Sequence, residues 1–384
     1  MSDIALVLGI RPDVIRASKI IELIDDFPEF NLDFIWSGQH YSENMKDIFF
    51  QQLNVRKPDF EFNIDGETDA DVVSSTIASL YNHLRDHSYK AVIFLGDTNT
   101  VMGSLAVAQH NIPIIHIEGC MRSYDWRMPE EKYRTTVDHL SDRIYAYLDQ
   151  YKTQGLNEGI GERRIMVTGN PIVDIINENK ELFDQGLDLL DDELKKVVQE
   201  GGYVLATCHR RENILDSESL NSIINLMNSI DDKIIFPMGY KTQEQVSKLN
   251  IKINDNIKVI DPIGYIEFMY ILDNAKYTIS DSGTVVEEAC ILGIPSIQVR
   301  KSTERPEVYE VNASVKFSPT EDADYKKIIM AVENLIGTKW EHPFGDGLAS
   351  ERIAKDIRDM YIKDSFNRHS REDYPFNTDR SYMS

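Results

Sequence analysis

The feature that most restricts the fold of this chain is the recurrence of short apolar, β-branched runs, most of them followed by a longer stretch of helical periodicity. Runs of this kind, separated by amphipathic segments such as residues 14–24, are typical of buried parallel strands joined by crossover helices. In the first half of the chain the runs are residues 4–9, 32–37, 91–96, 112–118, 143–148 and 164–169. In the second half they are residues 203–208, 233–238, 257–260, 277–280 and 296–300.

Eleven strands are too many for one compact sheet, but they suit two sheets of five or six strands. The length of 384 residues also suggests two or three domains. A cluster of chain-turning residues, Gly169-Asn170-Pro171, marks the natural break. We therefore predict an α/β protein whose two Rossmann-like, doubly wound domains, residues 1–169 and 170–345, face a central cleft. Residues 346–384 are predicted to form a C-terminal helix and a polar tail that packs back on the N-terminal domain.

Composition excludes several classes of protein. Apolar residues make up 42% of the chain, which rules out wholesale disorder. A net charge of -23 disfavours non-specific binding to nucleic acid or to an anionic membrane. No apolar run is long enough for a transmembrane helix, and we expect no signal peptide. Three well-separated cysteines, Cys120, Cys208 and Cys290, support neither a disulfide framework nor a Cys-rich zinc site, so a cytoplasmic protein without a bound metal is expected.

Polar residues that follow the apolar runs carry the functional information, because ligands of open α/β sheets bind beyond the carboxyl ends of the strands. These ends read Gly9-Ile10-Arg11-Pro12, Ser37-Gly38-Gln39-His40, Gly96-Asp97-Thr98-Asn99-Thr100, His116-Ile117-Glu118, Cys208-His209-Arg210-Arg211-Glu212 and Ser280-Asp281-Ser282-Gly283-Thr284. A single strand-end Asp usually caps a helix or forms a turn, but so many charged ends together favour a shared site. Neither a GxGxxG fingerprint nor a P-loop is present, which argues against a nicotinamide or kinase-type nucleotide site.

Seven motifs, in order from about residue 4 to residue 310, resemble the non-hydrolysing UDP-N-acetylglucosamine 2-epimerase family, in its archaeal and capsule-sugar branch. They are Gly9-Ile10-Arg11-Pro12, Gly96-Asp97-Thr98, His116-Ile117-Glu118, Pro129-Glu130-Glu131-x-x-Arg134, His209-Arg210-Arg211-Glu212, Ser280-Asp281-Ser282-Gly283-x-x-x-Glu287-Glu288 and Thr303-Glu304-Arg305-Pro306-Glu307. The family's fold is two Rossmann-like domains of the glycosyltransferase-B type, which agrees with the pattern of strands.

The resemblance implies inversion at C2 of a UDP-N-acetylhexosamine, UDP-N-acetylglucosamine to UDP-N-acetylmannosamine, for surface polysaccharide precursors. UDP is eliminated anti across C1–C2 to give a 2-acetamidoglucal and is then added back, with the proton on the other face. Such chemistry needs carboxylates on both sides of the sugar and cations for the departing diphosphate. The implied partner is the UDP-sugar substrate, without a cofactor or metal, nucleic acid or membrane, and a homodimer is expected.

The resemblance also carries over individual site residues. The catalytic residues it implies are Asp97, Glu118, Glu130 and His209. The substrate-binding residues are Arg11, Arg16, Arg134, Phe268, Ser282, Gly283, Glu288 and Arg305. Arg134 is expected to pair with Glu130, one helical turn earlier, and to hold it ionised.

On the nucleotide side of the implied site, different residues bind different parts of the substrate. Ser282 and Gly283 match a helix start that binds the diphosphate. Glu288 matches an acid that accepts from the ribose hydroxyls, and Phe268 stands where the family places an aromatic ring against uracil. Arg16 stands where many members have Lys.

Departures from the family pattern leave the identity of the hexose open. The loop between Glu118 and Glu130 is shorter than in the common bacterial enzymes, and Gly239 replaces a frequent His. The spacing from Gln39 to Met45 is longer than in the segment that binds an activating substrate molecule, so strong substrate activation is not expected. Alternatives are epimerisation of a related UDP-2-acetamido-deoxyhexose, a hydrolysing 2-epimerase, a glycosyltransferase and a non-enzymatic nucleotide-sugar sensor. The acid and base residues argue against a sensor, which gains nothing from them.

Overall fold

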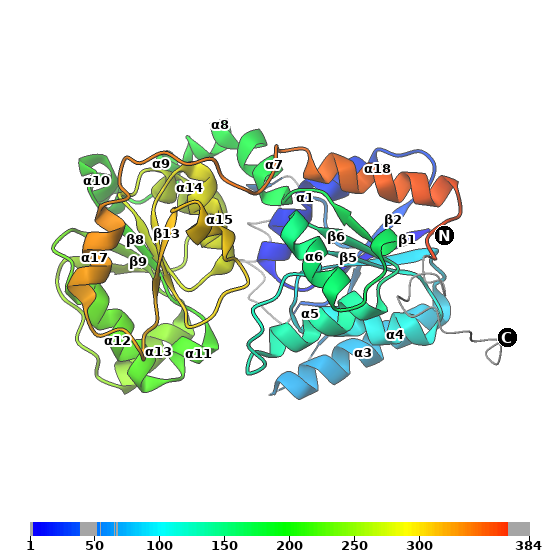
Figure 1. Ribbon diagram of the computed structural model, residues 1–384, viewed down its shortest axis with the longest axis horizontal. Coiled ribbons are helices and arrows are strands. Elements are labelled where there is room, and N and C mark those ends of the chain that lie inside the picture. The colour runs from blue at the N-terminus through cyan, green and yellow to red at the C-terminus, as the bar shows by residue number, and fades with distance from the viewer. Residues whose placement is uncertain (1–2, 39–51, 54, 65, 67, 368–384) are drawn as a thin grey trace. The chain divides into compact units, whose positions relative to one another are not determined.

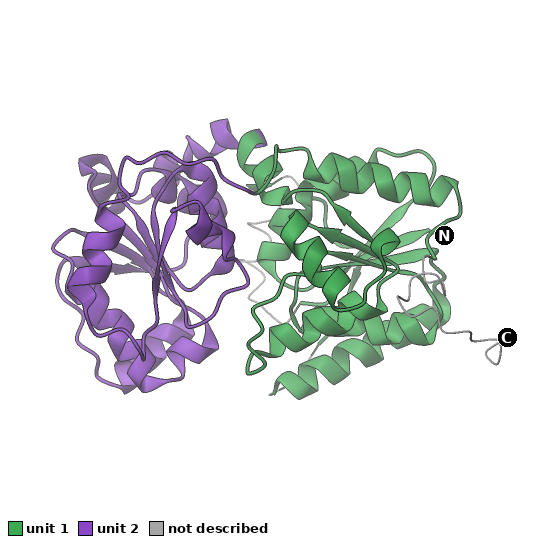
Figure 2. Cartoon of the chain, viewed as in Figure 1, with its two compact units in different colours: residues 1–177, 344–384 green, residues 178–343 purple. Residues whose placement is uncertain are grey.

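The computed structural model describes residues 3–38, 52–53, 55–64, 66 and 68–367. Contacts divide the chain into unit 1, Met1–Asn177 with Phe344–Ser384, and unit 2, Glu178–Pro343 (Figure 2). The activator-segment expectation, on residues 39–45, and the predicted polar tail from residue 368 lie outside the described residues. Among the described residues, none of the helices has the length and apolar character needed to cross a membrane.

Unit 1 is built on a parallel sheet of seven strands in the order β3-β2-β1-β4-β5-β6-β7, with helices on both faces (Figure 1). The strands are β1 (Ile4–Leu8), β2 (Leu32–Trp36), β3 (Phe60–Glu61), β4 (Ala91–Leu95), β5 (Ile114–Ile117), β6 (Arg143–Ala146) and β7 (Ile165–Val167). The helices are α1 (Arg11–Asp25), α3 (Asp69–Asp86), α4 (Ser104–Gln109), α5 (Pro129–Leu140), α6 (Asp149–Asn157), α7 (Pro171–Glu178) and α18 (Ala349–Ile362), with short 3₁₀ turns η1 (Asn99–Gly103) and η2 (Glu162–Arg164).

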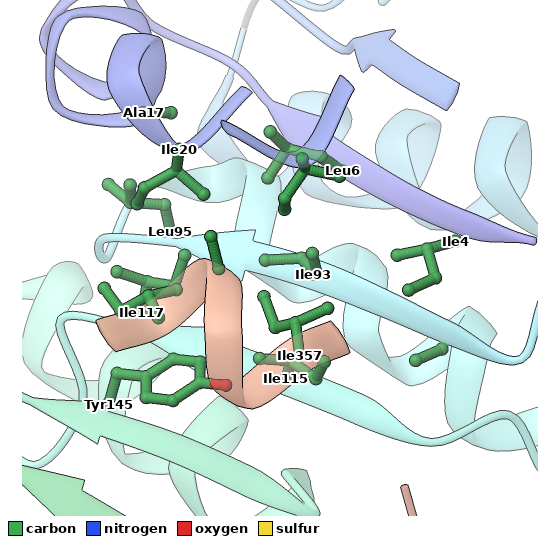
Figure 3. Packing of buried hydrophobic residues seen from close by; sticks show 14 of the residues in the cluster. Ile4, Leu6, Ala17, Ile20, Ile93, Leu95, Ile115, Ile117, Tyr145 and Ile357 are labelled. Atoms are coloured by element: carbon green, nitrogen blue, oxygen red, sulfur yellow. The ribbon is translucent and has the colours of Figure 1, made fainter. Parts of the chain in front are cut away.

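The central strands of unit 1 send alternate side chains into two apolar layers. Ile4, Leu6 and Leu8 of β1 join the layer that contains residues of α1 and α18, whereas Ala5 and Val7 join the layer under α3 and α4. Figure 3 shows the first layer, into which α18 inserts a side chain next to those of β4 and β5. Because both faces of the sheet are covered, the strands read as continuous apolar runs.

Unit 2 repeats the design with a parallel sheet of six strands in the order β10-β9-β8-β11-β12-β13. The strands are β8 (Val204–Thr207), β9 (Ile234–Pro237), β10 (Ile257–Ile260), β11 (Thr278–Ser280), β12 (Ser296–Val299) and β13 (Ser314–Phe317). The helices are α8 (Lys180–Phe183), α9 (Gly186–Leu189), α10 (Asp192–Glu200), α11 (Arg211–Ile214), α12 (Ser217–Asn228), α13 (Tyr240–Lys248), α14 (Tyr265–Asp273), α15 (Gly283–Leu292), α16 (Glu307–Glu310) and α17 (Tyr325–Glu333).

Every apolar run predicted as a strand contains one, and the predicted α/β class with two parallel, doubly wound sheets is confirmed. The expectation of five or six strands per sheet is wrong for unit 1, whose sheet has seven. The two strands that the sequence does not predict, β3 and β13, each lie at the edge of a sheet. The other two edge strands, β7 and β10, are predicted, so edge position alone does not hide a strand. What β3 and β13 share is a polar residue at an exposed position, Glu61 and Lys316, which interrupts the apolar run.

The strand order reverses once in each sheet, between β1 and β4 in unit 1 and between β8 and β11 in unit 2. In open parallel sheets, the loops that follow the two strands at such a reversal run to opposite faces of the sheet. A crevice for a ligand lies between these loops. The residues that follow these four strands therefore occupy the position at which each unit is suited to bind a ligand.

Candidate active site

Glu118, just after β5, forms part of a buried cluster that shares one cation. Its backbone has φ +73°, and Glu118 N and Gly119 N both donate to Tyr145 O at 3.1 Å, which holds the turn. Arg16 of α1 donates through Nη1 to Glu118 Oε2 and through Nη2 to Asp13 Oδ1, the latter at 2.9 Å. None of these three charged side chains is more than 5% exposed. One guanidinium thus serves two carboxylates, of which the sequence predicts only Glu118.

Asp13 is the unexpected member of this cluster. It is completely buried, and its Oδ2 has no hydrogen-bond partner among the described residues. Burial raises the pKa of Asp13 to about 7; the charge of Arg16 opposes this increase, while the charges of Glu118 and Asp97 add to it. Asp13 is therefore a carboxyl group that changes its charge near neutral pH.

Gly96 allows the end of β4 to approach this cluster. Its φ is +82°, and a Cβ atom on it would lie 3.2 Å from Asp13 Oδ1 and 3.4 Å from Arg16 Nη2. Both the backbone angle and the close approach favour glycine here. The next residue is Asp97, which the sequence predicts to be catalytic.

Asp97 is paired with Arg134 of α5. Arg134 donates through Nη2 to Asp97 Oδ2 and through Nη1 to Glu131 Oε2, the latter at 2.9 Å. The Arg134 side chain is buried, whereas that of Asp97 is 25% exposed. The sequence predicts that Arg134 pairs with Glu130; the structure shows pairs with the next residue, Glu131, and with Asp97. Glu130 itself lies partly exposed in the first turn of α5.

Glu131 also fastens the loop that precedes α5. Its carboxylate accepts from Ser123 N at 3.0 Å and from Tyr124 N at 2.9 Å. Because the same carboxylate pairs with Arg134, the loop conformation and the position of Arg134 depend on one another. Arg134 in turn fixes Asp97, so Glu131 connects the loop to the end of β4.

A second buried network joins the ends of β4 and β5. His116 of β5 has Nδ1 at 2.7 Å from Asp138 Oδ1 and Nε2 at 2.8 Å from Gly96 O. Asp138 also accepts from Cys120 N at 2.9 Å and from Arg122 Nη1 at 2.7 Å. Burial raises the pKa of Asp138, but the charge of Arg122 and these hydrogen bonds outweigh it and lower the pKa to about 2. An ionised Asp138 thus holds both strand ends in place.

In unit 2, Asp281 at the end of β11 accepts hydrogen bonds that hold the neighbouring backbone. Asp281 is completely buried and accepts from the backbone N–H groups of His209 and Arg210, the latter at 2.9 Å, and from Asn213 Nδ2 at 3.1 Å. The imidazole of His209 is 59% exposed, with Nδ1 3.5 Å from Asp281 Oδ1. Asp281 therefore fixes the backbone that follows β8 and leaves the His209 ring accessible.

Helix α15 begins beside a buried arginine. Ser282 is its N-cap, with Oγ accepting from Val285 N at 3.4 Å. A Cβ atom on Gly283 would overlap the guanidinium of Arg305. The Nε of Arg305 lies 2.8 Å from Glu287 Oε1, on the next turn of the helix. Ser282 N donates to Ser280 Oγ at 3.0 Å, so Gly283 and Thr284 carry the remaining N–H groups of this helix start. They and a cation meet at one helix end, which is an arrangement suited to a phosphate group.

Glu288 is buried and accepts from Tyr265 Oη at 2.9 Å. Burial raises the pKa of Tyr265 well above its ordinary value, so the phenol stays neutral and donates. Phe268 lies one turn further along α14 and is partly exposed. The ribose role of Glu288 and the uracil role of Phe268 stay predictions, as does the role of Arg11, the partly exposed first residue of α1.

Within each unit the structure brings several predicted site residues together. Arg16 contacts Glu118, and Arg134 contacts Asp97, whereas Arg305 lies against Gly283. The charged or polar residues that the sequence reasoning missed are Asp13, Glu131, Asp138 and Tyr265. Asp13 directly follows the quoted Gly9-Ile10-Arg11-Pro12 motif, and Glu131 stands within the quoted Pro-Glu-Glu motif; these positions are the signal that could have found them. In the described part of the chain, no three His, Cys, Asp or Glu side chains are grouped in a way that could hold a metal ion.

Comparisons with known proteins identify the family of this chain. The sequence profile of the UDP-N-acetylglucosamine 2-epimerase family matches residues 22–358. The chain is 36% identical over 365 residues to UDP-N-acetylglucosamine 2-epimerase of Methanocaldococcus jannaschii, covering 92% of this chain and 98% of that protein. It is 30% identical over 363 residues to UDP-2,3-diacetamido-2,3-dideoxy-D-glucuronate 2-epimerase of Pseudomonas aeruginosa, covering 92% and 98%.

Among solved structures, the crystal structure of the M. jannaschii enzyme in complex with UDP-GlcNAc and UDP resembles this chain with a TM-score of 0.85. That alignment is 34% identical and covers 93% of this chain and 99% of the other. The family resemblance inferred from the seven motifs is thereby confirmed. The chain belongs to the UDP-N-acetylglucosamine 2-epimerase family.

Proposed function

We propose that this protein inverts C2 of a UDP-N-acetylhexosamine, converting UDP-N-acetylglucosamine into UDP-N-acetylmannosamine without hydrolysis. The observation that carries the proposal is the occurrence of two carboxylate–guanidinium pairs at the ends of the adjacent strands β4 and β5. Asp97 pairs with Arg134, and Glu118 pairs with Arg16. A protein that only bound a nucleotide sugar would have no need of such an acid and base set.

The proposed reaction is an elimination followed by an addition. The C2–H bond and the bond between C1 and the diphosphate oxygen break, which leaves a 2-acetamidoglucal and UDP. The same diphosphate oxygen then returns to C1 while a proton is added to the opposite face of C2. Carboxylates on both faces of the sugar suit this sequence, and we assign Asp97, Glu118 and Glu130 to the proton transfers.

We assign the diphosphate to the start of α15 in unit 2. As UDP departs, negative charge develops on the diphosphate, and donors and cations stabilise it. Gly283 supplies a backbone N–H group and Ser282 its hydroxyl, and Arg305 supplies the cation. His209, whose ring is exposed, also belongs to unit 2 and is assigned a catalytic role. Arg11 and Arg16 complete the set of cations that we assign to substrate binding.

The nucleoside is assigned to the neighbouring residues of unit 2. Glu288 accepts from Tyr265, and a carboxylate held in this way suits ribose hydroxyl donors. Phe268, on the same helix as Tyr265, is assigned to stack on uracil. Neither assignment requires a metal or a nicotinamide, in keeping with the absence of a dinucleotide fingerprint from the sequence.

A second candidate substrate is a UDP-2,3-diacetamido-2,3-dideoxyhexuronate. The observation in its favour is the 30% identity to the P. aeruginosa 2-epimerase named for such a sugar. The same proton transfers at C2 would serve it, because the two sugars differ at C3 and C6 rather than at the reacting carbon.

One incubation in heavy water, followed by proton NMR, tests the proposal. With UDP-N-acetylglucosamine we expect UDP-N-acetylmannosamine to appear with deuterium at C2, without added metal or nicotinamide and after dialysis against a chelator. Free N-acetylmannosamine with UDP would indicate a hydrolysing enzyme. Exchange with the diacetamido sugar alone would indicate the second candidate, and no change without an acceptor would favour a glycosyltransferase.

We further propose that the enzyme acts in the cytoplasm and supplies a precursor for surface polysaccharide. The wide sequence spacing of the three cysteines, which gives no disulfide framework, supports the compartment. The homodimer stays a prediction, which light scattering of the purified protein would check.

A further inference from the structure

Arg16 holds two carboxylates at once through the two arms of its guanidinium. Nη1 donates to Glu118 and Nη2 donates to Asp13 at 2.9 Å. The planar fork of an arginine can direct separate N–H groups at two partners, whereas a lysine ammonium is a single compact charge. The linkage between Asp13 and Glu118 therefore depends on the guanidinium of Arg16.

The charge state of Asp13 depends on the charged groups around it. The charged groups that act on it are Arg16 on α1, Glu118 after β5 and Asp97 after β4. The side chain is completely buried, and Oδ2 has no hydrogen-bond partner among the described residues. An ionised oxygen left without a partner in such a place is costly, and adding a proton to the carboxyl group removes that cost.

We propose that Asp13 is a positioning residue that shares Arg16 with Glu118 and, by gaining or losing a proton, sets the strength of Glu118 as a base. The inference rests on the proposed epimerase function, in which Glu118 transfers a proton at C2. It adds a group that does not touch the substrate and acts only through Arg16 and through its own charge.

The direction of the effect follows from the charges. Burial raises the pKa of Asp13 to about 7. Below that pH Asp13 is neutral, so Arg16 acts fully on Glu118 and weakens it as a base. Above that pH Asp13 is negative, shares Arg16 and repels the charge on Glu118, which makes Glu118 a stronger base. Proton removal from C2 should therefore accelerate as the pH rises through neutrality, by roughly tenfold.

The kinetic test compares the pH dependence of kcat between pH 6 and 8.5 in the wild type and in Asp13→Asn. We expect the wild-type kcat to rise with an inflection near pH 7, and the variant to stay near the acidic level without an inflection. KM should change little, and Asp13→Glu should restore the rise. Thermal unfolding verifies that each variant is folded. An Asp13→Asn enzyme that keeps the inflection would overturn the proposal.

A matched control uses another buried carboxylate of the same sheet. Asp33, at the amino end of β2, accepts from Tyr89 Oη at 2.7 Å. It lies at the edge of the sheet opposite to Glu118, because the strands are parallel. Asp33→Asn should therefore keep the wild-type shape of the pH profile. If the inflection is lost in this variant too, its loss is a general effect of removing a buried charge. That result would contradict the role of Asp13.

A second measurement needs no turnover. The carboxyl carbon of Asp13 is observed by ¹³C NMR and assigned by its disappearance in Asp13→Asn. In Glu118→Gln the like charge is gone and Arg16 is freed for Asp13, so the titration midpoint of Asp13 should fall by a unit or more. An unchanged midpoint would overturn the proposal. A wild type that epimerises no UDP-acetamido sugar would instead contradict the proposed function, which keeps the two failures distinct.

Discussion

Asp97 and Asp281 occupy equivalent places in the two sheets and have opposite surroundings. Each follows the strand that lies across the strand-order reversal, β4 in unit 1 and β11 in unit 2. Asp97 is partly exposed and pairs with a guanidinium, whereas Asp281 is completely buried and accepts from backbone and amide N–H groups. The comparison teaches that the fold supplies a position, and that the neighbouring side chains decide whether a carboxylate there is available to a ligand or serves the structure.

The same contrast extends to the whole edge of each sheet. In unit 1 two arginines are shared among four carboxylates, an arrangement suited to moving protons. They are Arg16 and Arg134 with Asp13, Asp97, Glu118 and Glu131. In unit 2 the corresponding edge presents the start of a helix with small residues and a buried arginine, an arrangement suited to an anion.

The largest expected effect is on catalysis, from the carboxylates of unit 1. Asp97→Asn and Glu118→Gln preserve shape but remove a group that transfers a proton, so kcat should fall at least 100-fold, about 2.7 kcal/mol of transition-state stabilisation. The measurement is turnover of UDP-N-acetylglucosamine at saturating substrate, with the unfolding midpoint recorded for each variant. Retention of more than about a tenth of the activity would contradict the assigned roles.

The equivalent change in unit 2 should act on stability. Asp281→Asn replaces an acceptor oxygen by an NH₂ group that faces N–H donors, so the free energy of unfolding should fall by about 2–3 kcal/mol. Urea unfolding measures this change, and Asp97→Asn serves as the matched comparison because its carboxylate is partly exposed. A stable Asp281→Asn protein would show that the two strand ends differ less than their hydrogen bonds indicate.

A smaller effect is expected at the start of α15. Gly283→Ala places a Cβ atom where the guanidinium of Arg305 lies, so Arg305 must move and UDP binding should weaken about tenfold. Calorimetric titration with UDP measures the change. Gly239→Ala is the control, since a Cβ there meets no atom within 4 Å and its φ of -66° suits any residue. Equal UDP affinities in the two variants would remove Arg305 and Gly283 from the proposed diphosphate site.

The fold could be predicted because its main signal is local. Buried parallel strands need continuous apolar runs, and each run is visible without knowledge of its neighbours. Strands β3 and β13 escape this rule, since an exposed polar residue, Glu61 or Lys316, interrupts each of them. Within the site, Asp97, Glu118, Arg16 and Arg134 could be named from motif resemblance, whereas the way in which they pair could not.

The pairing of Arg134 shows what sequence spacing does not predict. An i,i+4 spacing suggests Glu130, but side chains on a helix meet at i,i+3 as well, and the end of another strand competes for the same guanidinium. The structure shows Arg134 donating to Glu131 and Asp97, two contacts that the spacing did not indicate. Competition of this kind is settled by distances across the fold, which no local spacing contains.

The sequence alone determined the α/β class, the parallel strands and the identity of the residues at the strand ends. Only the tertiary structure decided which charges are shared and which carboxylate oxygen, Asp13 Oδ2, is buried without a hydrogen-bond partner among the described residues. The reason is that burial and Coulomb energy depend on atoms from different elements, as when Arg16 of α1 meets Glu118 after β5. Asp13, an ordinary acidic residue in the first turn of a helix when read in sequence, becomes a group that titrates near neutral pH only once those elements close around it.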